Sequence, residues 1–139
     1  MGPGVWAMNN ENTVLRHHRF WLALGWAWIA LVIFLSLMPH PPEIEMRSGD
    51  KIGHLLAYAY LMLWFCQLYR ARPRKLAIAL GLVGLGIAIE FAQEQTGYRA
   101  FEWADMVADG MGVALGLLLG ETALAHALRQ TERLLTFRK

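Results

Sequence analysis

The chain contains four long runs of apolar residues, at about 20–38, 52–69, 76–93 and 104–120. An α-helix rises 1.5 Å per residue, so about 20 residues cross the hydrocarbon core of a bilayer. The first run contains no charged residue, and Pro39, Pro41 and Pro42 follow it, where they remove backbone donors and end the helix. The pattern predicts an all-α protein, an integral membrane bundle of four transmembrane helices.

The segments on either side of the four runs predict two tails. We expect a disordered N-terminal tail over residues 1–19, a membrane domain over 20–128 and a basic tail over 129–139. A secretory leader also places basic residues before an apolar run. However, the segment SLMPHPPE at the end of the first run offers no cleavage site between small residues. We therefore expect the first run to be retained as an anchor.

The composition favours a membrane protein over a soluble one. Hydrophobic residues make up 56% of the 139 residues and charged residues 17%, whereas soluble domains carry about 25% charged residues. The net charge of +2 is too small for a surface that binds nucleic acid, so we expect no nucleic-acid partner. Cys66 is the only cysteine, which excludes an intramolecular disulfide.

The basic residues predict the orientation of the four spans. Four spans place both termini on one side of the membrane, and most of the 13 Lys and Arg residues fall on that side. Basic residues are enriched in cytoplasmic loops, so we expect both termini in the cytoplasm. The opposite side holds Arg47, Lys51 and Arg99.

Polar side chains recur at helical spacing in the outer halves of the last three spans. Residues four apart share one helix face, so Asp50, His54 and Tyr58 form one stripe. Glu90 lies inside an apolar run, where an ionisable group is costly and marks a functional site. The first span has no ionisable residue and is expected to form a packing wall. The predicted ligand-binding residues are Asp50, Lys51, His54, Tyr58, Glu90, Gln93, Arg99, Asp105 and Asp109.

Four interpretations of this cluster stay open. A structural lock would pair Glu90 with His54 or Tyr58. An anionic head group would be bound by Lys51 and Arg99 beside two helix N-termini. Catalysis would use His54 as a general acid or base, although no nucleophile stands at motif spacing. A cation would be held by His54 with Glu90, Glu94, Asp105 or Asp109, but the spacing is not a metal-ligand pattern, so we predict no metal and no cofactor.

Three glycines follow the acidic start of the fourth span. Gly112, Gly116 and Gly120 are four residues apart, so they lie on one helix face. Small residues in this pattern let a second helix approach closely. They predict a close helix contact, either within the bundle or with a membrane-protein partner.

Three segments in this order, DKIGHLLAYAYLMLW, EFAQEQTGYR and ADMVADGMGVALG, resemble the VanZ-like family of small bacterial membrane proteins. The resemblance covers about residues 50–120. Asp109 stands where that family usually has Asn. The positions that match the family pattern are Asp50, Lys51, His54, Tyr58, Glu90, Gln93, Arg99, Asp105, Gly112 and Gly116.

The resemblance implies a multi-pass protein of the bacterial cytoplasmic membrane with a role in the cell envelope. The member that gives the family its name is associated with resistance to the glycopeptide teicoplanin. Together with the polar cluster, the resemblance favours binding of membrane lipids or of a lipid or glycolipid-type envelope ligand. A membrane enzyme acting on a lipid-linked substrate, and an assembly partner without a ligand, stay as alternatives.

Overall fold

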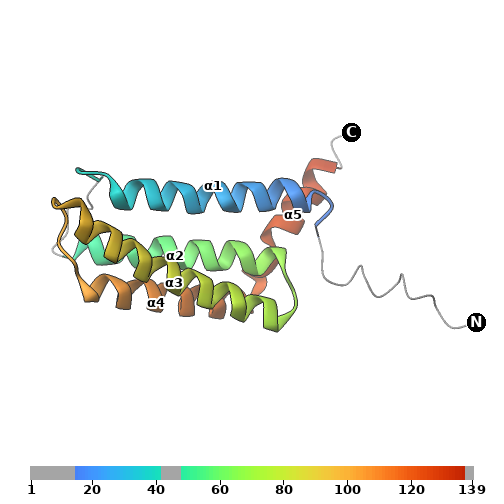
Figure 1. The fold of residues 1–139 in the computed structure, drawn as a ribbon. Helices are drawn as coiled ribbons and strands as arrows, with labels where there is room; N and C mark the ends of the chain where they lie inside the picture. Colours follow the sequence, from blue (N-terminus) through green and yellow to red (C-terminus); the bar gives the residue numbers. More distant parts are fainter. Residues whose placement is uncertain (1–14, 42–47, 137–139) are drawn as a thin grey trace, which may run out of the picture.

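The computed structural model describes residues 15–41 and 48–136 of the chain, and these residues are helical apart from short connections. The helices are α1 (His18–Leu37), α2 (Gly49–Leu68), α3 (Arg72–Thr96), α4 (Trp103–Leu119), the 3-10 helix η2 (Ala123–His126) and α5 (Ala127–Thr136). In Figure 1, α1 to α4 run side by side in alternating directions. The end of α1, the start of α2 and the α3–α4 connection therefore lie at one end of the bundle, and α5 lies at the other end.

Local chemistry explains where the helices begin and end. After α1, Met38 adopts an extended conformation and Pro39 follows it, as expected for a residue before proline. Pro73 lies in the first turn of α3, where its missing N–H removes no helical hydrogen bond. Gly97 ends α3 with φ of 75°, a left-handed conformation that glycine adopts at little cost.

The core of the bundle is built around α2. Tyr58, Leu61, Met62 and Cys66 of this helix are buried against α3 and α4 side chains such as Leu82. A second cluster of buried residues lies at the other end of the bundle, near the start of α1 and the end of α2. It contains Leu15, Trp64, Phe65, Leu68 and Leu128. The most apolar sequence, α1, contributes one fully buried residue, Gly25, so its side chains mostly face outward.

The three α4 glycines pack against α2 of the same chain. A Cβ atom added to Gly112 would overlap the carbonyl oxygen of Leu55, and one added to Gly116 would lie 2.5 Å from the carbonyl oxygen of Ala59. At Gly120 the added atom would lie 2.7 Å from Cys66 Sγ. The close helix contact that the spacing predicts is therefore made within the bundle.

The prediction of four transmembrane helices is wrong. Among the described residues, two helices, α1 and α3, are long and apolar enough to cross a membrane. α4 has 17 residues and buries Asp105 and Asp109, so it is too short and too polar. α2 begins with charged and polar residues and directs its apolar side chains into the core. The placement of both termini in the cytoplasm depended on four spans and is withdrawn with them.

The structure describes only part of each of the two predicted tails. Residues 1–14 and 137–139 lie outside the described residues. Of the predicted N-terminal tail, His18 and Arg19 already belong to α1. Residues 129–136 of the predicted basic tail belong to α5, an amphipathic helix of ten residues.

Candidate functional site

The predicted polar residues gather at the end of the bundle where α1 joins α2 and α3 joins α4. Asp50, Lys51 and His54 come from the first turns of α2. Asp105 and Asp109 come from the first turns of α4, which packs closely along α2. The helical stripes predicted on separate helices thus face each other across the α2–α4 contact.

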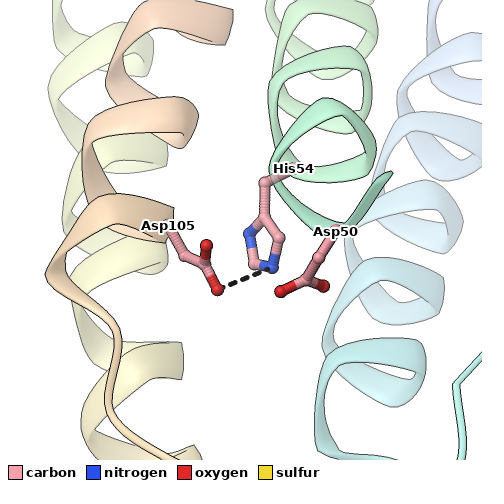
Figure 2. A group of neighbouring side chains, drawn as sticks. All are labelled: Asp50, His54 and Asp105. Carbon is pink, nitrogen blue, oxygen red and sulfur yellow. Dashed lines mark ion pairs between the residues drawn. The ribbon is translucent and has the colours of Figure 1, made fainter. Parts of the chain in front are cut away.

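His54 lies between two carboxylates of α4. Its Nδ1 atom is 2.9 Å from Asp109 Oδ1, within hydrogen-bonding distance. Its Nε2 atom is 3.7 Å from Asp105 Oδ2, which is too long for a hydrogen bond. Figure 2 shows the imidazole between Asp105 and Asp50, with the ring edge directed toward both carboxylates. Asp109 is 2% exposed and Asp105 3%, so α4 presents two buried carboxyl groups to one histidine.

Lys51 links the start of α2 to the start of α4. Its Nζ atom donates a hydrogen bond to Glu102 Oε2 at 2.7 Å and lies 3.3 Å from Asp105 Oδ1. The hydrogen bond to Glu102 and then the nearby carboxylate of Asp105 raise the pKa of Lys51 above its ordinary value, so the ammonium group stays charged. Glu102 is not among the site residues predicted from the sequence. Its position directly before an apolar helix, where acidic residues are favoured, is the signal that could have found it.

Glu90 of α3 binds the backbone at the start of α4, next to the site. Its side chain is buried, and Oε2 accepts a hydrogen bond from the backbone N–H of Glu102 at 3.0 Å. A carboxylate next to a helix N-terminus is stabilised by unpaired N–H groups and by the helix dipole. The partner of Glu90 is therefore the start of α4, whereas the structural-lock hypothesis paired it with His54 or Tyr58.

Two further predicted residues have different surroundings. Gln93 is buried, and its Nε2 donates to the carbonyl oxygen of Ser36 at 2.8 Å, which ties α3 to the end of α1. Tyr58 is 1% exposed, yet its hydroxyl has no hydrogen-bond partner among the described residues. A buried hydroxyl without a partner costs free energy, so Tyr58 marks a place where a bound molecule can supply one.

An open cavity of about 580 Å³ lies beside these groups. One wall is the apolar end of α1, including Val32 and Leu35, and another is the start of α2. The α3–α4 connection completes it with Arg99 and Glu102. Among the predicted site residues, those that line the cavity are Asp50, Lys51, His54, Tyr58, Arg99 and Asp105, whereas Glu90, Gln93 and Asp109 are not part of its lining.

Arg99 is the second basic residue, after Lys51, that lines the cavity. It is partly exposed in the α3–α4 connection and makes no hydrogen bond or ion pair with any residue in the described ranges. The cavity therefore contains two permanently charged bases, Lys51 and Arg99, beside Asp50, Glu102 and Asp105. This mixture suits a ligand that carries both hydrogen-bond donors and an anionic group.

The chain is similar to an uncharacterized protein of the fission yeast Schizosaccharomyces pombe. The two are 33% identical over 95 residues, which is 66% of this chain and 59% of the yeast protein. No protein-family model matches the chain, and no solved structure matches it. The resemblance to the VanZ-like family, and the bacterial membrane location that it implies, therefore stay predictions.

Proposed function

We propose that this protein is a membrane-bound lipid-binding protein that holds a polar, phosphate-bearing or glycosylated head group in the cavity at the α1–α2 end. The acyl chains would lie against the apolar surface of α1. The observation that carries the proposal is the cavity itself, which joins an apolar wall from α1 to a polar wall from α2 and α4. An amphipathic molecule fits such a boundary better than a wholly polar one does.

Exposed apolar side chains support the membrane part of the proposal. Only 6% of the apolar stretch of α1 and 33% of that of α3 is buried inside the bundle. Leu80 of α3 is 75% exposed, and Phe34 and Trp26 of α1 are more than half exposed. Continuous apolar surface of this kind is unfavourable in water and is typical of helices that face lipid.

The size and the charges of the cavity support the proposal that a lipid head group binds there. Ligand cavities usually span about 300–1,000 Å³, and a volume of about 580 Å³ is enough for a head group. Lys51 and Arg99 suit a phosphate, while Asp50 and Glu102 accept hydrogen bonds from hydroxyl or amine groups. The unpartnered hydroxyl of Tyr58 is one further group that a head group could engage.

Two glycine substitutions give a matched test. Gly53 lines the cavity, and a Cβ atom added there meets no other atom within 4 Å, so Gly53→Leu fills the cavity without a clash at Cβ. Gly81 of α3 has equally open surroundings and does not line the cavity, so Gly81→Leu is the control. Both exchanges replace glycine by a better helix former.

Native mass spectrometry of protein released gently from its own membrane provides the readout. We expect the wild type and Gly81→Leu to retain an adduct with the mass of a membrane lipid, and Gly53→Leu to lose it. Circular dichroism confirms that the three proteins are equally helical. Equal lipid retention by Gly53→Leu, or a wild type without any adduct, would contradict the proposal.

A further inference from the structure

We propose that Asp50, His54 and Asp105 form a binding site for one divalent transition-metal ion, with Zn²⁺ as the fitting example. Figure 2 shows the three side chains converging from the start of α2 and the start of α4. One ligand atom from each residue lies within 4.8 Å of the other two. The inference concerns the metal alone and does not depend on lipid binding.

The separations suit ligands of one ion better than direct hydrogen bonds. Zinc binds nitrogen and oxygen at about 2.0–2.2 Å, so two ligands at a tetrahedral angle are about 3.4 Å apart. His54 Nε2 and Asp105 Oδ2 are 3.7 Å apart, close to this value and beyond hydrogen-bonding distance. Asp50 is exposed in the first turn of α2, so a small side-chain rotation completes the set.

Asp109 orients His54 for this role. A carboxylate only accepts hydrogen bonds, so the 2.9 Å contact places the imidazole proton on Nδ1. In the neutral imidazole the lone pair is then on Nε2, which faces Asp105 and Asp50 (Figure 2). Metal-binding histidines usually donate their other N–H to a carboxylate or carbonyl in this way. The hydrogen bond to the buried Asp109 therefore orients the partly buried His54 so that the neutral imidazole presents Nε2 to a metal ion.

The surroundings of Asp105 are a second observation that favours a cation at this place. Its carboxylate is 3% exposed, but Oδ1 accepts no hydrogen bond from the described residues. Lys51 lies 3.3 Å from Oδ1 and is shared with Glu102, to which it is closer. A buried carboxylate needs a compensating charge or metal coordination, and Asp105 shares its nearest permanent cation, Lys51, with Glu102.

The charges around the site also favour a cation. Four carboxylates, those of Asp50, Glu102, Asp105 and Asp109, surround Lys51 and His54. One histidine nitrogen with two carboxylate oxygens is a donor set that suits Zn²⁺ and Mn²⁺. The sequence pattern did not identify this set because Asp50 and Asp105 are far apart in the chain.

Calorimetric titration with Zn²⁺ tests the site. The full chain without an affinity tag is purified in detergent, treated with a chelator, dialysed and titrated. We expect one Zn²⁺ per chain, with binding weakened at least about 100-fold by Asp105→Asn and about 10–100-fold by Asp109→Asn. Glu94→Gln removes an exposed carboxylate of α3 outside the set and should leave the affinity unchanged.

X-ray absorption of the Zn²⁺-loaded wild type keeps the test independent of how the variants fold. We expect one imidazole nitrogen and otherwise oxygen ligands at about 2.0–2.2 Å. A helical wild type that does not bind Zn²⁺ at micromolar concentrations would overturn the proposal. So would a folded Asp105→Asn that binds as tightly as the wild type, or a spectrum without a single imidazole. The carboxylates would then act as an interhelical lock for His54.

Discussion

Gly112 and Gly116 determine how closely α4 approaches α2, and thereby the distance across which His54 meets Asp105 and Asp109. The atoms that a side chain at Gly112 would meet are backbone atoms of Leu55 and Ala59. Backbone atoms of a helix cannot move aside without shifting the whole helix, so these glycines are required by space rather than by conformation.

We predict opposite effects for two alanine substitutions two residues apart in α4. Gly112→Ala should lower the free energy of unfolding by about 1–3 kcal/mol, because the added methyl overlaps the Leu55 carbonyl. Gly110→Ala has open space around its Cβ and should be neutral or stabilising by up to about 1 kcal/mol, because alanine favours the helix. Chemical unfolding followed by circular dichroism measures both, and equal effects would contradict this packing.

The site residues could be predicted within each helix but not between helices. Spacing of four residues places Asp50 with His54, and Asp105 with Asp109, and the structure keeps both pairs in the site. Contacts between helices depend on rotation about each helix axis, which spacing leaves open. For that reason the interhelical pair of His54 and Asp109 was not assigned, and Gln93, expected in the site, bonds to Ser36 instead.

At the scale of elements, α5 is attached to the start of α1 by one carboxylate. Glu132 accepts hydrogen bonds from the backbone N–H groups of Arg16 and His17 and from Trp21 Nε1, at 2.7–2.9 Å. Burial raises the pKa of Glu132, but the hydrogen bonds from His17, Trp21 and Arg16 outweigh it, so the pKa lies below its ordinary value of 4.5. The ionised form is therefore the one that holds α5 in place.

The attachment of α5 should weaken in acid. A carboxyl group with a lowered pKa in the folded state contributes stability above its ordinary pKa of 4.5, and this is lost as the pH falls through the folded value. We expect Glu132→Gln to lower stability at neutral pH by about 1–3 kcal/mol and to lose less on acidification than the wild type. Thermal unfolding between about pH 7 and pH 3 measures this. An unchanged pH dependence in Glu132→Gln, relative to Glu94→Gln as control, would contradict it.

The number of spans was mispredicted because the polar starts of two helices were not counted against them: α2 begins with Asp50 and Lys51, and α4 has 17 residues and contains Asp105 and Asp109. The α2 sequence is apolar enough to suggest a span, but Leu61, Met62 and Leu68 fill the interior of the bundle. The α1 sequence is similarly apolar, and its side chains face outward. Helical structure and most helix boundaries follow from apolar runs, proline and glycine, whereas the distinction between core helices and outward-facing helices requires the packed structure.

For the whole molecule, the exposed surface of α3 should be what retains the chain in a membrane. Leu80 in α3 is 75% exposed and Leu134 in α5 is 73% exposed, so they form a matched pair. A charged residue in a spanning helix costs about 2.5–3.5 kcal/mol for insertion. We expect the wild type and Leu134→Lys to stay with membranes during alkaline extraction, and Leu80→Lys to be released in part. Complete release of the wild type would contradict membrane insertion.

Photo-crosslinking tests where a lipid binds on the whole molecule. A phospholipid that carries a photoreactive group on its head group is added to the protein in its membrane, and the labelled peptides are identified by mass spectrometry. We predict that the label falls on the residues within 32–36 and 48–58 that line the cavity, such as Leu35, Ser36 and Ala57, and that Gly53→Leu suppresses it while Gly81→Leu does not. Label confined to the outer faces of α1 and α3, and unchanged in Gly53→Leu, would contradict a lipid head group in the cavity.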